Sequence, residues 1–507
     1  MFKNRKNAGV YFSLYQMSEN TIQLTKTKFL SAVQCLKKFY LEIYKPDIAA
    51  TLSSSELAII NESIEIGKLA RNKFNEGVLI DAIDLDKAIE KTWQAIENNN
   101  IKTIFEPAFR FKNIFLRPDI IIKDDNNCFN IIEVKSATNI KKYFKFDLGI
   151  QYYVLRNLGF EVSKAFIMYI DSGYIYRKET YDLDKLFKIE DLTIEMDQIQ
   201  SEIENKLFLI QKAINNKNEP DISVGKHCKK PFLCPFLKYC LEGLENPIIE
   251  LPRISDNLLN ILKELGITEI SDISEGVVKL SDLQQRVRDV VITGKPFFDK
   301  KIHSELDKLN YPINFLDFEA FNPALPIYFD TKPYQMIPFQ WSNHILYKNG
   351  KIFHKEFLHL DVSLPYQDFI TSLINNLNNG GSIIVFSGFE SVRMKEIAIN
   401  FLELQPQINS IIDRLIDLQL IIKKYFYFPE FHGSYSLKKV LPSLIPELSY
   451  ENLAITDGSM AAMFYKKLIN KNTSQQEKNL IKEQLLAYCK LDTLAMLELY
   501  KYFKGLR

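Results

Sequence analysis

Three residues in the first third of the chain have the types and spacing needed to hydrolyse a phosphodiester. Asp119 begins one short apolar run, and Glu133 and Lys135 close the next. Carboxylate oxygens bind hard cations such as Mg2+ or Mn2+, which polarise a phosphoryl oxygen and lower the pKa of a bound water. Residues two apart on a strand face the same side, so we expect Glu133 and Lys135 to share a site in which Lys135 orients the attacking water.

The context of this motif decides between catalysis and a solvated strand edge, because Glu-x-Lys alone fits both. A Pro-Asp pair precedes the motif, and Gln151 follows it on an expected helix, where its amide can position water or phosphate. This order favours a metal-dependent site, with Asp119 and Glu133 as metal ligands and Lys135 and Gln151 as catalytic partners.

A second acidic pattern lies in the last two fifths of the chain. Asp317 and Glu319 are two apart on an apolar run, and Tyr488 and Asp492 are one helical turn apart. Two strand acids and a helix acid can hold two cations about 3.5 to 4 Å apart, which stabilises both the attacking and the leaving oxygen. We expect Tyr488 to orient the water nucleophile there.

Four of the six cysteines enclose the first acidic pattern. Three of them form a local group with equal gaps and the fourth lies far upstream: Cys228, Cys234 and Cys240 with Cys35. Because we expect a cytoplasmic chain, in which thiols stay reduced, this group indicates a metal centre that closes the domain, and four thiolates suit zinc or an iron-sulfur cluster equally well. We expect the other two cysteines, Cys128 and Cys489, to be small buried hydrophobes.

The elements that would position these groups alternate between helices and strands. Apolar spacing predicts helices over residues 25–44, 55–76, 86–98, 151–158 and 190–214, and strands over 109–115, 119–122, 129–134 and 165–170. After Pro247 and Pro252 it predicts a helical connector over 255–308, strands over 313–319 and 382–386, and helices over 391–404, 410–426 and 477–503. This alternation predicts an α/β protein.

Composition limits the class of protein and of partner. A chain of 507 residues is too long for one core, and 46% hydrophobic with 25% charged residues is ordinary globular composition. No apolar run is long enough to cross a bilayer and no signal peptide is visible, so we expect a cytoplasmic protein with no membrane partner. The net charge of +1 leaves nucleic-acid binding to local basic patches such as residues 141–145.

The order of cysteine, acid, Glu-x-Lys, glutamine and three cysteines resembles the P-D-(D/E)-x-K nucleases of the RecB type, in particular the CRISPR-associated and helicase-linked members that hold a 4Fe-4S cluster. The resemblance covers about the first 245 residues. It implies a restriction-endonuclease-like fold in which Cys35, Cys228, Cys234 and Cys240 bind a 4Fe-4S cluster, with zinc as the alternative.

One departure from this family concerns an additional metal ligand. Many members carry a histidine on an early helix, and the corresponding residues 64–71 contain none. Glu106 is therefore a candidate additional acid for the metal, the alternative being a surface charge.

The second acidic pattern resembles the DEDD exonucleases of the DnaQ-like, ribonuclease H-like fold, in their tyrosine variant. The resemblance makes Asp317 and Glu319 the first motif, and Tyr488 and Asp492 the third. Glu390 stands at the place of the middle aspartate, and Asp417 is the other candidate for that ligand. Glutamate in place of aspartate puts efficient 3'-5' exonuclease activity in question, and a degenerate fold that only binds nucleic acid is the alternative.

Together the two resemblances match an uncharacterised bacterial family that pairs both domains. They imply a RecB-like domain over residues 1–248, a helical connector over 249–310 and a DnaQ-like domain over 311–507. The leading hypothesis is a Mg2+- or Mn2+-dependent nuclease for single-stranded DNA ends or flaps in repair, recombination or defence, with a helicase or defence-system protein as a further partner. The alternatives are an RNA-processing exonuclease and a non-catalytic iron-sulfur subunit that binds nucleic acid; serine, histidine and cysteine nucleophiles have little support.

Overall fold

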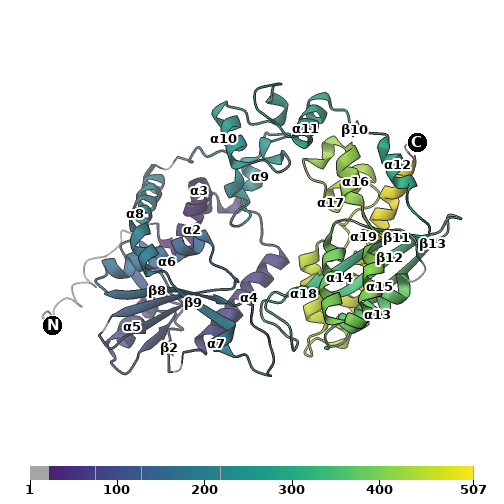
Figure 1. Ribbon diagram of the computed structural model, residues 1–507. Helices are drawn as coiled ribbons and strands as arrows, with labels where there is room; N and C mark the ends of the chain where they lie inside the picture. The colour runs from purple at the N-terminus through teal and green to yellow at the C-terminus, as the bar shows by residue number, and fades with distance from the viewer. Residues whose placement is uncertain (1–21, 75, 127, 217, 378–379, 506–507) are drawn as a thin grey trace. The chain divides into compact units, whose positions relative to one another are not determined.

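The computed structural model describes residues 22–505 except 75, 127, 217 and 378–379, and the chain forms two compact units, Met1–Glu242 and Gly243–Arg507 (Figure 1). Each unit has its own hydrophobic core and its own mixed sheet covered by helices, so the predicted α/β class is confirmed. None of the helices that the structure describes combines the length and the apolar composition needed to span a bilayer.

The first unit is built on a six-stranded sheet with the order β2-β3-β6-β7-β8-β9. Its strands are β2 (Val78–Leu79), β3 (Thr103–Phe105), β6 (Ile120–Lys123), β7 (Phe129–Lys135), β8 (Val162–Ile170) and β9 (Phe187–Asp191). The central strand β7 is antiparallel to β6 and parallel to β8. A small second sheet has the order β1-β5-β4, with β1 (Leu24–Thr25), β4 (Phe109–Phe111) and β5 (Ile114–Leu116).

Helices cover the sheet of the first unit. The helices against the sheet or at its edges are α4 (Ser54–Arg71), α5 (Leu85–Glu97), α6 (Lys142–Asn157), α7 (Leu183–Leu186) and α8 (Thr193–Asn216). The crossover helix α6 joins the parallel strands β7 and β8, and α6 and α8 pack together against β8 (Figure 1). The first turns of this crossover helix therefore lie near the end of β7, where the predicted acids lie.

The helix predicted over residues 25–44 is wrong as a single element. Two helices occupy this stretch, α2 (Lys26–Gln34) and α3 (Leu36–Tyr44), and Cys35 separates them with an extended backbone at φ −165° and ψ 122°. Both halves have the apolar spacing of a helix, so apolar spacing alone does not reveal the break. The break turns Cys35 out of the helical path and toward the late cysteines.

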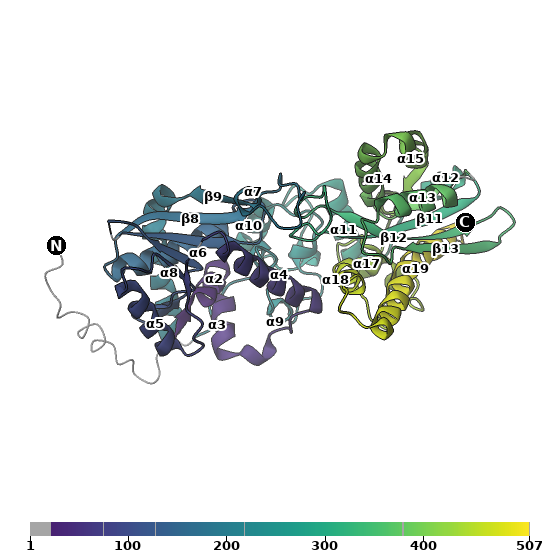
Figure 2. The same cartoon turned by 90° about the horizontal axis from the view of Figure 1, so that it is seen from below.

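The second unit contains a five-stranded sheet with the order β13-β12-β11-β14-β15. Its strands are β11 (Ile313–Phe321), β12 (Ile337–Leu346), β13 (Ile352–Leu358), β14 (Ile383–Val385) and β15 (Leu415–Asp417). Helices α13 (Tyr366–Leu377), α14 (Phe389–Asn400) and α15 (Gln405–Ile412) lie on one side of it, and α17 (Leu437–Leu444), α18 (Gly458–Leu468) and α19 (Gln475–Gly505) on the other (Figure 2). Strands β14 and β15 run parallel to β11, so their carboxyl ends share one edge.

The segment 249–310 packs onto the rest of the second unit. It contains α10 (Asp256–Glu264), α11 (Asp282–Thr293), β10 (Phe297–Phe298) and α12 (Lys301–Asp307). Strand β10 pairs with β16 (Phe426–Tyr427), and Arg286 Nη1 donates to the carbonyl of Lys423 at 2.8 Å. A Cβ on Gly433, which has a φ of +72°, would lie 1.7 Å from the carbonyl oxygen of Glu250, so glycine permits this close approach.

Two parts of the second sheet differ from expectation. The hairpin of β12 and β13 was not predicted, because apolar and polar residues alternate in β12 only as far as Ser342 and two more polar residues, Asn343 and His344, follow, although every residue of this strand is buried. The helix predicted over 410–426 is wrong in its middle: β15 pairs with β14 there, and α16 (Leu418–Tyr425) begins only after Asp417, whose side chain caps it.

Candidate active sites

The first acidic pattern forms a buried network at the carboxyl end of β7. Glu133 is 1% exposed, and Lys135 Nζ lies 2.7 Å from its Oε1. Asp119, just before β6, accepts a hydrogen bond on Oδ2 from the backbone N–H of Val134 at 2.7 Å. Gln151, on α6, is fully buried and donates from Nε2 to Glu133 Oε2 at 2.8 Å. The four predicted residues of this pattern are thus brought together.

Two further residues belong to this network and were not predicted. Lys26, the first residue of α2, places Nζ 2.7 Å from Glu133 Oε1 and 3.5 Å from Asp147 Oδ1. Asp147, one turn before Gln151 on α6, is 3% exposed and also pairs with Lys135. The first site therefore consists of three carboxylates, two ammonium groups and one amide.

The amide of Gln151 is only half satisfied. Its Nε2 donates to Glu133 and to both the side chain and the carbonyl of Asp147, but its buried Oε1 has no hydrogen-bond partner among the described residues. A buried acceptor without a donor is costly, so this oxygen indicates that a water or a ligand completes the site.

Burial and neighbouring charges shift the pKa values of Asp119 and Glu133 in opposite directions. Burial and the charge of Glu133 raise the pKa of Asp119 to about 7. Burial also acts to raise the pKa of Glu133, but Lys135 and Lys26 outweigh it and hold that pKa well below its usual range. Glu133 is therefore ionised at neutral pH. A cation bound near Asp119 would favour the ionised form of Asp119.

Glu106 does not enter this network. Its backbone N–H donates to the carbonyl of Asp119, but its carboxylate lies 3.2 Å from Arg71 Nη1 and 3.9 Å from Arg117 Nη2. The Glu106 side chain is 45% exposed. Its observed contacts are thus those of a partly exposed ion pair, and no described hydrogen bond or ion pair joins its carboxylate to the first site.

The four cysteines of the predicted metal centre lie around one small core. Gln34, next to Cys35, donates from Nε2 to the carbonyls of His227 and Phe232 at 2.7 and 2.8 Å, which ties the helix break to the late loop. Within that loop the N–H of Cys234 donates to the carbonyl of Cys228 at 2.8 Å. All six cysteines lie in the described residues, and none forms a disulfide.

The sulfur atoms of this cysteine cluster share one electrostatic environment. Burial raises the pKa of Cys240 to about 11; Lys37 opposes this rise, and the thiols of Cys228, Cys234 and Cys35 add to it. Among the residues that the structure describes, no three of these sulfurs lie within 4.8 Å of one another. The remaining two cysteines differ: Cys489 is fully buried, whereas Cys128 is only half-buried, so the expectation of burial is wrong for Cys128.

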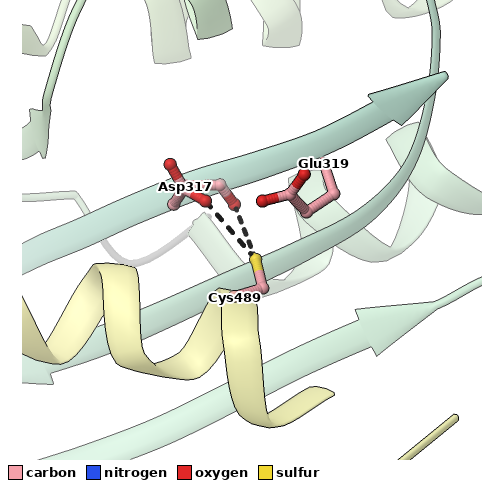
Figure 3. Close-up of side chains that lie close together, drawn as sticks. All are labelled: Asp317, Glu319 and Cys489. Carbon is pink, nitrogen blue, oxygen red and sulfur yellow. Dashed lines mark hydrogen bonds between the residues drawn. The ribbon is translucent and has the colours of Figure 1, made fainter. Parts of the chain in front are cut away.

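The second acidic pattern centres on β11 and α19. Asp317, Glu319 and Cys489 each bring one ligand atom within 4.8 Å of the others (Figure 3). Cys489 Sγ lies 3.5 Å from Asp317 Oδ2 and 3.8 Å from the Asp317 carbonyl oxygen. Gly458, at the start of α18, lies beside Glu319 Oε2, which a Cβ at that glycine would approach to 3.6 Å.

Phenols surround the last acid of this pattern. Tyr450 donates from Oη to Asp492 Oδ1 at 2.5 Å, and Tyr488 also hydrogen-bonds this carboxylate. The Tyr450 and Tyr488 rings are 6.2 Å apart, and Lys438 Nζ lies 5.2 Å from the Tyr488 ring centroid. Both tyrosines are buried, so they can hold Asp492 and a neighbouring water in fixed positions.

Both candidates for the middle acid lie at the same sheet edge. Glu390, in the first turn of α14, is 3% exposed, and its Oε2 has no hydrogen-bond partner among the described residues. Asp417 ends β15, is half-buried, and accepts a hydrogen bond from the N–H of Leu420 at 3.2 Å. Glu390 is therefore available to a cation, whereas Asp417 already serves as a helix cap.

The second site has an excess of negative charge. Burial and mutual repulsion with Asp492 raise the pKa values of Asp317 and Glu319 well above their usual range. Burial raises the pKa of Glu390 to about 8, and that of Asp492 to about 6 against the opposing hydrogen bond of Tyr450. Four crowded carboxyl groups with one nearby lysine need either protons or cations.

Comparisons with known proteins find relatives without an assigned function. A family model described as a domain of unknown function (DUF2779) matches residues 314–436, which include Asp317, Glu319, Glu390 and Asp417. An uncharacterized protein of Mycoplasma genitalium, MG366, is 20% identical over 651 residues that cover 97% of this chain and 97% of the relative. A solved structure titled "Crystal structure of SSO0001" matches 47% of this chain and 94% of its own at 16% identity, with a TM-score of 0.25.

Sequence reasoning missed three polar residues that contact the two sites: Lys26, Asp147 and Tyr450. Two of them were visible as residue types: Lys26 follows a capping threonine, and Asp147 stands four positions before Gln151, which is one helical turn. Tyr450 comes from a connecting segment with no periodic signal that would assign it a partner. The spacing of Asp147 and Gln151 was therefore the one usable clue.

Proposed function

We propose that the chain is a metal-dependent nuclease that hydrolyses phosphodiester bonds at two sites, one in each unit. The observation that carries this proposal is the arrangement of the second site, where Glu319, Glu390 and Asp492 are each under 10% exposed and Glu390 Oε2 has no hydrogen-bond partner among the described residues. Buried carboxylates are stable only when they are protonated, paired or bound to a metal. Divalent cations held there would polarise the scissile phosphate and activate a water.

The residues of the second site have separate tasks in this scheme. Asp317, Glu319 and Glu390 supply ligand oxygens from adjoining elements, and Asp492 supplies one from α19. Tyr450 holds Asp492 in the ionised form by donating a hydrogen bond to it. Tyr488 hydrogen-bonds the same carboxylate and is the group that orients the attacking water. Lys438 contributes positive charge next to the developing negative charge on the phosphate.

The first site has the groups for the same reaction. Asp119 and Glu133 are the ligand pair, and Lys135, 2.7 Å from Glu133 Oε1, is positioned to orient water and offset charge on the phosphate. Gln151 Oε1, which has no hydrogen-bond partner among the described residues, can accept a hydrogen bond from that water. Exposed Lys141 and Lys142 at the start of α6 are available to a substrate phosphate.

The strand arrangement supports the finer fold assignments. In the second unit the acids lie on β11, just after β14 and at the end of β15, which are parallel neighbours, and ligand sites form where parallel strands end. This agrees with a ribonuclease H-like domain over residues 311–507. In the first unit, acids at adjoining ends of β6 and β7 and a glutamine on the crossover helix agree with a RecB-type domain over residues 1–248.

For the cysteine cluster we propose a 4Fe-4S cluster rather than zinc. Zinc draws four thiolates to about 2.3 Å from one atom, which puts their sulfurs roughly 4 Å apart. The sulfurs of Cys35, Cys228, Cys234 and Cys240 share one environment, but no three of them lie within 4.8 Å of one another in the part of the chain that the structure describes, which suits a larger inorganic core. Such a cluster would join the start and the end of the first unit.

The test is cleavage of end-labelled single-stranded DNA, double-stranded DNA and RNA by the full chain with Mg2+ or Mn2+. We expect single-stranded DNA to be cut. Lys135→Ala should lower the activity of the first site roughly a hundredfold, and Asp317→Ala should lower that of the second site by the same factor. Lys102→Ala, at an exposed lysine paired with Asp125, is the matched control and should cut normally. Cutting that survives in the double variant would refute both sites, and RNA cleavage lost only in Asp492→Ala would reassign the substrate to RNA.

A further inference from the structure

The first site differs from the second in its internal positive charge. Two ammonium groups, Lys26 and Lys135, both reach Glu133 Oε1 at 2.7 Å, and both also reach Asp147. The second site has one lysine nearby, Lys438, which lies over the Tyr488 ring and has no described ion pair with its carboxylates. The two sites therefore present different charges to cations.

A count of ionised groups gives the size of the difference. The first site has three carboxylates and two ammonium groups, a formal charge of −1. The second has at least four carboxylates and one ammonium group, a formal charge of −3. One divalent cation brings the first site to +1, and two bring the second to the same value.

The hydrogen-bonding capacity of Glu133 leads to the same difference. A carboxylate has about four lone-pair positions. On Glu133, Oε1 already receives Lys26 and Lys135, and Oε2 receives Gln151, so one position remains for a cation. In the second site, Glu390 Oε2 has no described partner, and the hydrogen bond described for Asp317 Oδ2 is the weak thiol contact of Cys489. Glu133 can therefore contact one metal ion but cannot bridge two.

The fold holds Lys26 at this position. Strand β1 pairs in parallel with β5, and Thr25 caps α2 by accepting a hydrogen bond from the N–H of Lys28 at 3.2 Å. The Lys26 side chain is 23% exposed, so it reaches the buried acids from the rim of the site. Its charge is thus part of the fold and not a mobile surface feature.

We propose, resting on the proposed function, that Lys26 supplies in the first site the positive charge that a second cation supplies in the second site. The first site then holds a single divalent ion between Asp119 and Glu133, with Asp147 balancing the two lysines. Lys26 is a positioning residue in this scheme, because it acts through Glu133 and Asp147. The two halves of the chain would carry out phosphodiester hydrolysis with one and with two cations, respectively.

The experiment counts bound Mn2+ per chain from the six-line electron paramagnetic resonance signal of the free ion, in full-length protein whose second site is blocked by Asp317→Asn and Asp492→Asn. We expect one Mn2+ in this parent and two after Lys26→Met, because Glu133 and Asp147 each regain a free position. Lys26→Arg keeps the charge and should return the count to one. Lys28→Met, on the same helix but near Glu42, is the matched control and should also give one.

The outcomes separate this inference from the function on which it rests. A single Mn2+ in Lys26→Met, at any affinity, overturns the inference, as do two in the parent. If Glu133→Gln does not reduce the Mn2+ bound by the parent, the metal site fails, and the proposed function of the first unit fails with it. Circular dichroism and thermal unfolding check the fold of each variant, and Lys26→Gln replaces Lys26→Met if the latter does not fold.

Discussion

Tyr450 Oη lies 2.5 Å from Asp492 Oδ1, a hydrogen bond that joins the segment after α17 to the helix carrying the last acid of the second site. The two residues are 42 positions apart, and both are under 10% exposed. A hydrogen bond to a carboxylate favours its charged form, so Tyr450 opposes the burial that raises the pKa of Asp492. Tyr450 therefore keeps Asp492 usable as a ligand near neutral pH.

Tyr450→Phe should raise the pKa of Asp492 and move the acidic limb of second-site activity to higher pH. We expect turnover at pH 6 to fall by about tenfold, which equals roughly 1.4 kcal/mol, and to fall less at pH 8, where Asp492 is ionised in both proteins. The measurement is the pH profile of cleavage in a Lys135→Ala background, which silences the first site. Tyr502→Phe, elsewhere on α19, is the control, and parallel profiles for the two variants would contradict the role of Tyr450.

Without cations, the second unit should lose stability as the pH rises. Asp317, Glu319, Glu390 and Asp492 all have pKa values raised above those of the unfolded chain. The folded state therefore binds more protons than the unfolded state, and the free energy of unfolding falls from about pH 4.5 through the folded pKa of Glu390 at about 8. Thermal unfolding in EDTA should show this decline, and Mn2+ should reverse it at pH 8; a midpoint that rises over this range would contradict it.

How far the sequence predicts these sites depends on whether a partner is local. Glu133 with Lys135, Asp317 with Glu319 and Tyr488 with Asp492 are fixed by strand or helix periodicity, and each pair is brought to one site. Lys26 and Glu133 are 107 positions apart, and no local pattern relates them. The break at Cys35 and the strand β15 depend on tertiary packing that overrides helical spacing, which is why both were predicted as helix.

Glu390→Gln should make the protein more stable in EDTA and less responsive to metal. Glu390 is buried and its Oε2 has no described partner, so at about pH 9 its charge opposes folding unless a cation is present. We expect a higher unfolding midpoint in EDTA and a smaller rise on adding Mn2+. Glu396→Gln, which removes a half-exposed partner of Arg393 on the same helix, is the control. An unchanged Mn2+ response in Glu390→Gln would favour Asp417 as the middle ligand.

Asp147→Ala should destabilise the first unit, because it leaves Lys26 and Lys135 with Glu133 as their remaining close acid. Breaking a buried ion pair by removing one partner costs about 3 to 5 kcal/mol, and the partial exposure of Lys26 places the expected loss at the lower end of this range. Asp125→Ala, whose acid is almost fully exposed, should leave the free energy of unfolding unchanged. Urea unfolding measures both, and equal midpoints would show that Asp147 does not balance the lysines.

Cys234→Ser should remove the colour of anaerobically purified protein and lower its unfolding midpoint. Cys234 is 6% exposed, and its loop is tied to Gln34 beside the helix break at Cys35, so a bound cluster joins the two ends of the first unit. Ligand binding that occurs only in the folded state adds to its stability, and losing one of four ligands removes that contribution. Cys128→Ser, at a half-buried cysteine outside the cluster, should keep both the colour and the midpoint. A colourless parent containing zinc would overturn the iron-sulfur assignment, while equal midpoints for the two variants would show that the cluster does not stabilise this unit.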